Sequence, residues 1–113
     1  NERRAIREQE KHLITYLLYE LGVDLAAYPI SETVYEYEDG IMGSISLGEE
    51  NVSVYDGDLI QVAFKDVDGI PVVITLTKDT EGNLLDLDFW KEDFSKLIEY
   101  PTPEKITIKQ KHI

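Results

Sequence analysis

The chain has 113 residues, 42% hydrophobic and 30% charged, a balance that is typical of a globular protein and argues against disorder. The absence of cysteine excludes disulfides and thiolate metal sites, and no apolar run reaches the roughly 18 residues of a membrane span. A net charge of −12 argues against nucleic-acid and membrane binding, because an acidic surface repels phosphate, but it permits a basic protein partner. We therefore expect one cytoplasmic domain over residues 1–113.

Residues 3–21 are predicted to form an amphipathic helix. Basic residues lie four apart on its outer side, and Gly22 follows as the C-terminal stop. Cations are unfavourable at a helix N-terminus, so a start one turn later would fit the charges better. The apolar stripe consists of Ile6, Leu13, Ile14, Leu17, Leu18 and Leu21.

Beyond a connector with Pro29, the period changes to alternation, which predicts an antiparallel β-meander of about five to seven strands over residues 33–90. Asp39-Gly40 predicts a two-residue hairpin, and Asp56-Gly57-Asp58 predicts a further turn. Residues 91–109 are expected to form a C-terminal cap and an edge strand, the cap being irregular or a short helix. Three strands share an apolar face that needs a cover, and the helix supplies one. The fold class is therefore α+β, with two layers. The predicted strands are 33–38, 41–47, 52–55, 59–65, 70–77, 84–90 and 104–109.

One row of side chains could carry chemistry. Asp86, Asp88 and Trp90 alternate along a strand, so they point to one face, the two aspartates about 6.6 Å apart along the chain. Paired carboxylates beside an aromatic ring occur in enzymes that cleave glycosidic bonds. In the alternative interpretation the aspartates cap the turn that follows or form ion pairs, with Lys65, Lys78 or Lys91.

Two aspartate-rich stretches, Asp66-Val67-Asp68-Gly69 and Asp56-Gly57-Asp58, resemble fragments of calcium loops. Neither has the spacing or the flanking helices of an EF-hand, so we interpret both as turns. The only histidines, His12 and His112, lie near opposite ends of the chain, without further ligands in register. The sequence therefore predicts no metal site, no catalytic residue and no cofactor.

The acidity has a location. The 53 residues from His12 to Phe64 contain ten acidic residues and no lysine or arginine. Tyrosines and carboxylates alternate on the first predicted strand, a composition typical of protein-binding surfaces. Ordinary strand packing of the aromatic residues is the alternative. The predicted binding residues are Tyr35, Glu36, Tyr37, Glu38, Asp86, Asp88 and Trp90.

Three motifs carry a resemblance: Met42-Gly43-Ser44, Asp66-x-Asp68-Gly69 and Leu87-Asp88-x-Trp90-Lys91-x-Asp93-Phe94-x-x-Leu97. On these motifs the chain resembles a family of small uncharacterised bacterial domains of unknown function. The resemblance extends from the helix to about Pro101. The resemblance implies a fold and no activity. A looser similarity connects the last motif with small acidic immunity proteins of bacterial toxin systems.

The last motif also has a structural interpretation. Leu87 and Phe89 are expected in the core, Trp90 and Phe94 as anchors at the strand end, and Asp93 as a helix N-cap.

The leading hypothesis is a non-enzymatic, acidic protein-binding domain, similar to an immunity protein, with a basic partner. One alternative is a small hydrolase or carbohydrate-binding protein that uses Asp86, Asp88 and Trp90. The other alternative is a structural or oligomerisation domain. The sequence does not distinguish a monomer from a homodimer.

Overall fold

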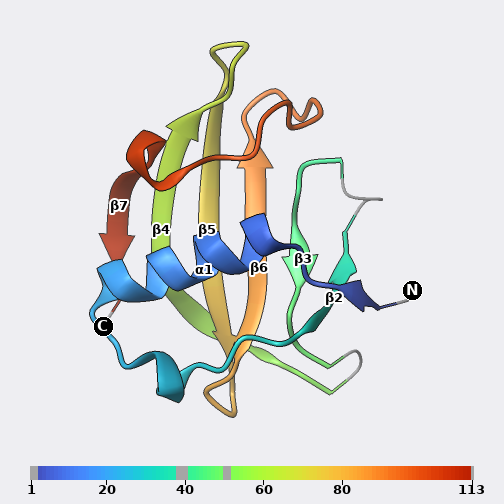
Figure 1. Ribbon diagram of the computed structural model, residues 1–113, viewed down its shortest axis with the longest axis vertical. Helices are drawn as coiled ribbons and strands as arrows, with labels where there is room; N and C mark the ends of the chain where they lie inside the picture. The colour runs from blue at the N-terminus through green and yellow to red at the C-terminus, as the bar shows by residue number, and fades with distance from the viewer. Residues whose placement is uncertain (1–2, 38–40, 50–51, 113) are drawn as a thin grey trace.

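The computed structural model describes residues 3–37, 41–49 and 52–112. Within these ranges one α-helix, α1 (Glu8–Leu21), lies across one face of a seven-stranded antiparallel sheet (Figure 1). The α+β class is confirmed. Two 3-10 turns, η1 (Leu25–Ala27) and η3 (Pro103–Lys105), lie in the connections. The strands are β1 (Arg4–Ala5), β2 (Thr33–Glu36), β3 (Ile45–Ser46), β4 (Tyr55–Lys65), β5 (Pro71–Asp79), β6 (Leu84–Lys91) and β7 (Thr107–Lys111).

The strand order is β1-β2-β3-β6-β5-β4-β7. Successive strands are neighbours in two runs, β1-β2-β3 and β4-β5-β6, rather than in one continuous meander. The runs are joined because β3 pairs with β6, and β7 closes the other edge against β4. The predicted C-terminal edge strand is present as β7. Since β6 lies between β3 and β5, its side chains have strand neighbours on both sides, which places the row that begins at Asp86 well inside the sheet.

The core lies between α1 and the sheet. Each of its main side chains is at most 7% exposed, and strand residues enter it at every second position, as the alternation predicts. The stripe on α1 contributes Leu13, Ile14, Leu17, Leu18 and Leu21, and the three long strands contribute Ile60, Val62, Phe64, Val72, Ile74, Leu76, Leu87 and Phe89.

The helix begins at Glu8, one turn later than residue 3, and ends at Gly22, whose φ of 81° forms the left-handed cap. The Glu10 carboxylate, which is buried, accepts the Arg7 N–H at 2.8 Å and thereby fixes the first turn. It also accepts two hydrogen bonds from the Arg4 guanidinium, at 3.0 and 2.8 Å. The basic N-terminus is therefore not in the helix, and Arg4 starts the short edge strand β1 instead.

Two local predictions are wrong, and a third lies outside the described residues. Asp56-Gly57-Asp58 is no turn but an irregularity inside β4, where Gly57 has a φ of 122° and the register with β5 shifts. The predicted hairpin turn at Asp39-Gly40 falls on residues that the structure does not describe; β2 and β3 pair through Glu36 and Ile45. No helix follows Asp93, whose carboxylate instead accepts bonds from the Ser95 N–H and hydroxyl.

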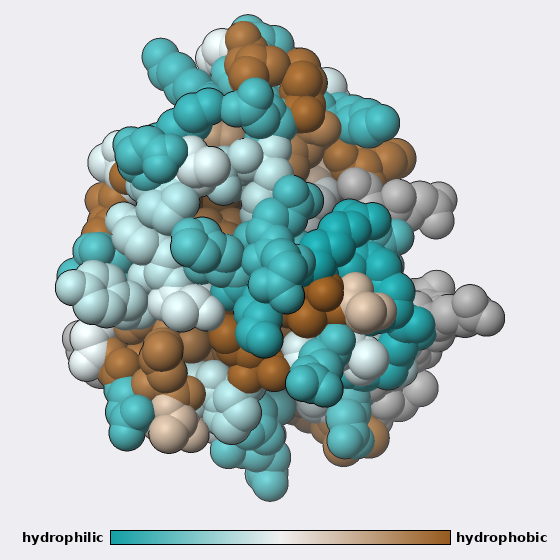
Figure 2. Space-filling view, viewed as in Figure 1, coloured by the Kyte–Doolittle hydropathy of each residue, from teal (hydrophilic) through white to brown (hydrophobic). Residues whose placement is uncertain are grey.

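The two faces of the sheet differ. Figure 2 shows the face that α1 covers, where polar residues dominate the middle of the surface. On the opposite face β6 presents Asp86, Asp88 and Trp90, and no helix or strand among the described residues lies over them. The parts of the chain that the structure describes include no helix with the length and apolar character to cross a membrane.

Candidate functional site

The three sequence motifs, far apart in the chain, meet at the C-terminal end of β6. Lys91, the last residue of β6, lies at the centre of this meeting point. Its backbone N–H points to the Met42 sulfur at 3.5 Å, and its side chain reaches the carboxylates of Asp66 and Asp68. The motifs therefore build one local structure.

The Met42-Gly43-Ser44 segment brings the chain against β6. Gly43 has a φ of 95°, and a Cβ atom there would lie 3.2 Å from the Leu97 side chain, so both the backbone and the space favour glycine. Ser44, which is buried, continues the β3–β6 pairing with its side chain. Its Oγ accepts the Phe89 N–H at 2.8 Å and lies 3.2 Å from the Phe89 carbonyl oxygen and 3.3 Å from Asp88 Oδ1.

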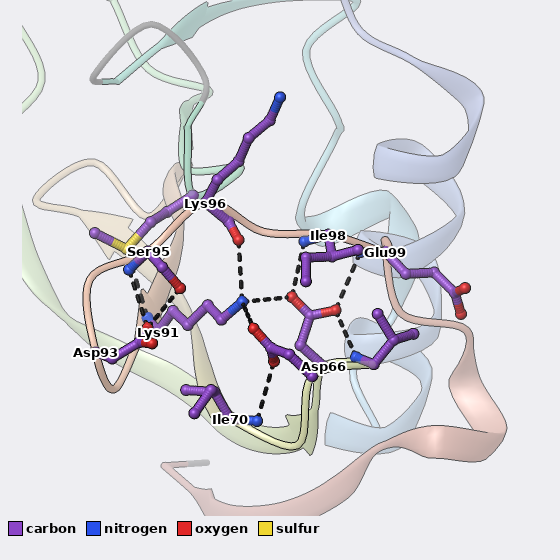
Figure 3. A network of polar contacts seen from close by, with 11 residues as sticks. Asp66, Ile70, Lys91, Asp93, Ser95, Lys96, Ile98 and Glu99 are labelled. Atoms are coloured by element: carbon purple, nitrogen blue, oxygen red, sulfur yellow. Dashed lines mark hydrogen bonds and ion pairs between the residues drawn. The ribbon is translucent and has the colours of Figure 1, made fainter.

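Lys91 is fully buried, and its ammonium group has three acceptors (Figure 3). These are Asp66 Oδ2 at 3.0 Å, Asp68 Oδ2 at 2.7 Å and the Lys96 carbonyl oxygen at 3.0 Å. Three acceptors match the three protons of an ammonium group. Burial lowers the pKa of Lys91, but the two carboxylates outweigh it and hold the pKa above its usual value. We call this arrangement the Lys91 clasp.

Asp66, also buried, is the second centre of the clasp. Besides Lys91, its carboxylate accepts the N–H groups of Val67 at 2.8 Å, Ile98 at 2.8 Å and Glu99 at 3.1 Å. Burial raises the pKa of Asp66, but these hydrogen bonds and the Lys91 ammonium lower it by more than burial raises it. The pKa of Asp66 therefore lies below its usual value. The Asp66–Gly69 turn is thus tied to the segment after β6.

That segment, residues 92–99, forms what we call the strap. The Glu92 N–H bonds to the Pro71 carbonyl at 3.0 Å and the Leu97 N–H to the Ile41 carbonyl at 3.0 Å. Together with the Lys91 clasp, these bonds hold a segment without regular secondary structure in place. Phe94 in the strap has a φ of 61°, the one positive value at a non-glycine residue in the described ranges. A bulky residue in this strained region is a feature that often accompanies functional sites.

Phe94 and Trp90 form an exposed aromatic pair. Phe94 is 65% and Trp90 45% exposed, and their rings pack edge to face with centroids 5.9 Å apart. Two exposed rings in contact form a local apolar patch, and exposed apolar patches often mark interaction sites. The pair borders a hollow of about 470 Å³ on the uncovered face of the sheet. The hollow is lined by Tyr37, Met42, Ser44, Asp86, Asp88, Phe89, Trp90 and Phe94.

The polar wall of the hollow carries uncompensated negative charge. The Tyr37 hydroxyl donates to Asp86 Oδ1 at 2.8 Å, whereas neither Asp86 nor Asp88 forms an ion pair with a described residue. Residues 1–2, 38–40, 50–51 and 113 add no Lys, Arg or His side chain. Burial raises the pKa of Asp86, the Tyr37 hydroxyl opposes this rise, and the Asp88 charge adds to it.

The ion pairs that the sequence suggested for these aspartates are therefore absent. Lys78 pairs with Asp56 at 2.7 Å, and Lys91 is used in the clasp. The structure instead brings Asp86, Asp88 and Trp90 together with Tyr37. Of the predicted binding residues, these four share one hollow.

The remaining predicted residues lie elsewhere. Glu36 points to the helix side, where it pairs with Arg4 at 2.9 Å and Arg7 at 3.6 Å. Tyr35 lies under the Arg3 guanidinium, 4.5 Å from the ring centroid. Glu38 is outside the described residues. Among those described, no group of three or more His, Asp and Glu side chains is arranged to hold a metal ion.

A larger hollow of about 820 Å³ lies next to Tyr35 and the β5–β6 turn. Two of its charged groups, Arg3 and Asp79, are already bonded within the fold. Arg3 donates to Thr33 Oγ1 at 2.7 Å and to the Gly48 carbonyl at 3.1 Å, and Asp79 accepts the Glu81 N–H at 2.9 Å. The hollow beside Trp90 is the better candidate site, because it combines two carboxylates that form no ion pair with a described residue and an exposed pair of aromatic rings.

One family comparison covers most of the chain. A family model described as a domain of unknown function, DUF6984, matches residues 3–101. The chain belongs to that family. The expected resemblance to a domain of unknown function is confirmed, and the family description adds no activity. No curated protein and no solved structure matches the chain.

Sequence reasoning missed three residues of the site. Met42 and Ser44 were visible only as members of the motif Met42-Gly43-Ser44, and Phe94 only as a structural anchor in the last motif. Periodicity could not find them, because all three lie in irregular segments whose positions depend on long-range bonds such as that between Leu97 and Ile41. The resemblance was the one signal that pointed to them.

Proposed function

We propose that this protein is a non-enzymatic binding domain whose hollow beside Trp90 docks a basic segment of a partner protein. The observation that carries the proposal is that two carboxylates without a cationic partner share a hollow with two exposed aromatic rings. Aromatic residues dominate the energetics of protein interfaces, and charge complementarity sets partner choice and association rate.

The surroundings of the hollow support this proposal. The rings of Trp90 and Phe94 are exposed beside the negative wall. This combination fits a segment in which basic and apolar residues alternate. Net charge of −12 would attract such a segment from a distance.

The acidic stretch from His12 to Phe64 contributes less than its composition suggests. Glu36 and Asp56 are paired with cations, and Asp24 and Asp58 accept hydrogen bonds from neighbouring groups. Asp86 and Asp88 on β6 combine unpaired negative charge with a hollow and two exposed aromatic rings. A basic toxin is one class of partner that this arrangement suits, and the absence of cysteine fits a reducing cytoplasm.

A selection experiment tests the proposal. A library of random twelve-residue peptides is selected on the wild-type protein and counter-selected on the double variant Asp86→Asn/Asp88→Asn. We expect enriched peptides to be basic and their affinity to fall with salt. The control, Glu8→Gln/Glu81→Gln, removes the same charge from two exposed positions outside the hollow and should bind as the wild type does. Peptides that bind all three proteins equally, or bind independently of salt, would contradict the proposal.

A small hydrolase is the second candidate, and one observation favours it. Asp86 and Asp88 lie in a real hollow, and burial raises the pKa of Asp86, which is a property of a general acid. Hydrolysis of a panel of nitrophenyl glycosides, compared between wild type and Asp86→Asn, tests this. Equal background rates for the two proteins would exclude glycosidase activity on these substrates.

A further inference from the structure

The hydrogen-bonding character of the hollow specifies its ligand further. The Tyr37 hydroxyl proton is directed to Asp86, and the Ser44 proton to the Phe89 carbonyl or to Asp88. Both hydroxyl protons are thus used inside the wall. A side chain that enters meets mainly acceptors, so it must bring several donors and a positive charge.

The number and arrangement of donors distinguish between cations. Asp86 and Asp88 are two residues apart on β6, so their Cα atoms lie about 6.6 Å apart and their side chains point to the same face. An ammonium group has three donors on one nitrogen, whereas a guanidinium group has five donors on a planar fork that matches the geometry of carboxylates. A guanidinium can therefore donate to both carboxylates from different nitrogens and keep its flat face free for stacking. The acceptor-rich wall thus suits arginine better than lysine.

Trp90 supplies the third contact. It follows Asp88 by two residues on β6 and so continues the row on the same face. Its indole is partly exposed and is held by the edge-to-face contact with Phe94. A planar guanidinium stacks on an indole face, and this contact is strongest for tryptophan. The strap holds the Phe94 ring beside Trp90, and this position accounts for the strained backbone of Phe94.

We propose that the hollow binds one arginine side chain of the basic segment, with the guanidinium bridging Asp86 and Asp88 and stacked on Trp90. This inference rests on the proposed function and narrows it from a basic segment to an arginine anchor. The Lys91 clasp has a positioning role here, because it holds the strap that carries Phe94.

Trp90 provides the readout, since it is the only tryptophan in the chain. Three N-acetylated amino-acid amides, those of arginine, lysine and citrulline, are titrated against the 113-residue protein at low salt. Trp90 fluorescence and the indole N–H signal in ¹H–¹⁵N spectra are followed. Citrulline matches arginine in shape but has no charge. We expect saturable shifts with arginine amide, at least tenfold weaker binding of lysine amide, and no shift with citrulline amide.

The variants localise the effect. Asp86→Asn and Asp88→Asn should each weaken arginine binding at least fivefold, whereas Glu8→Gln/Glu81→Gln should leave it unchanged. Trp90→Phe, followed by the backbone signals of β6, should weaken it while the carboxylates remain.

The outcomes separate the two proposals. Equal binding of arginine and lysine amides would overturn the arginine anchor and leave the docking of a basic segment intact. Binding of citrulline amide as tight as that of arginine amide would overturn it as well, because the charge would be irrelevant. If no amide binds although the peptide selection succeeds at Asp86 and Asp88, the anchor is wrong and the proposed function stands. If both experiments fail, both proposals fall.

Discussion

Replacing Asp66 with asparagine perturbs the Lys91 clasp while almost preserving the shape of the side chain. One carboxylate oxygen of Asp66 accepts the N–H groups of Val67 and Glu99, and the other accepts the Ile98 N–H and the Lys91 ammonium. An amide has only one oxygen. In either orientation, its NH₂ group would face two donors that have lost their acceptor.

The number of hydrogen bonds lost sets the size of the expected loss in unfolding free energy. Each buried donor without a partner costs about 1–3 kcal/mol, so two cost about 2–6 kcal/mol. Removing one partner of a buried ion pair costs about 3–5 kcal/mol. We therefore expect Asp66→Asn to lower the free energy of unfolding by about 4 kcal/mol. Asp68→Asn is the matched control, because it makes the same charge change at a side chain that is 32% exposed. Water can replace its lost bond, so we expect at most about 1 kcal/mol.

Urea unfolding, followed by Trp90 fluorescence and by far-ultraviolet circular dichroism, measures both losses. With a slope of about 2 kcal/mol per molar urea, the midpoint of Asp66→Asn should fall by about 2 M and that of Asp68→Asn by at most about 0.5 M. Equal losses in the two variants, or a loss below about 1 kcal/mol for Asp66→Asn, would refute the central role of Asp66.

The pH dependence provides an independent check. The pKa of Asp66 in the folded protein lies below its usual value of 3.8. A carboxyl with a lowered pKa stabilises the folded state fully above its unfolded pKa, and this stabilisation disappears as the pH falls through the folded value. The difference between wild type and Asp66→Asn should therefore be complete at pH 7 and shrink below about pH 4. A difference that does not change with pH would mean that the charge of Asp66 contributes nothing.

Three further variants have an expected direction of change in the stability of the fold. Gly43→Ala should lower the free energy of unfolding by about 1–3 kcal/mol, and by more than Gly82→Ala does. Both glycines have a positive φ, but only a Cβ atom at Gly43 would contact a neighbouring side chain. Equal urea midpoints for the two variants would contradict this. Asp86→Asn should not destabilise the protein at pH 7 and should raise its urea midpoint, since a raised pKa means that the charged carboxylate is unfavourable in the fold; a lower midpoint would show a structural role. Tyr100→Phe should be neutral or stabilising, because the buried Tyr100 hydroxyl has no partner among the described residues; a loss above about 1 kcal/mol would mean that the hydroxyl is bonded after all.

Much of the fold could be predicted from local patterns. The helical stripe that ends at Gly22 and the alternation in β4, β5 and β6 require only neighbours within a few residues, and they gave the fold class and the core. The start of α1 was misplaced because it depends on Glu10, whose carboxylate bonds to Arg4 and to the Arg7 N–H at once. Local propensity contains no information about such a contact.

The candidate site divides in the same way. Alternation alone placed Asp86, Asp88 and Trp90 on one face, because the period of a strand is two. It could not exclude ion pairs with nearby lysines, since that depends on where Lys78 and Lys91 point. The tertiary structure excludes an ion pair between Lys91 and these aspartates, because the Lys91 ammonium is bound in the Asp66–Gly69 turn. Lys91 and Asp66 are 25 positions apart in the sequence.

The sequence by itself thus determined the class of fold, the core and the excess of negative charge, because composition and periodicity are properties of the chain. Only the tertiary structure decided which negative charges are free. It neutralises Glu36 and Asp56 with distant cations and leaves Asp86 and Asp88 without any, beside Trp90. The reason is physical: an ion pair forms across a few ångströms of space, and the pairing of strands brings those atoms together from positions that no local pattern connects.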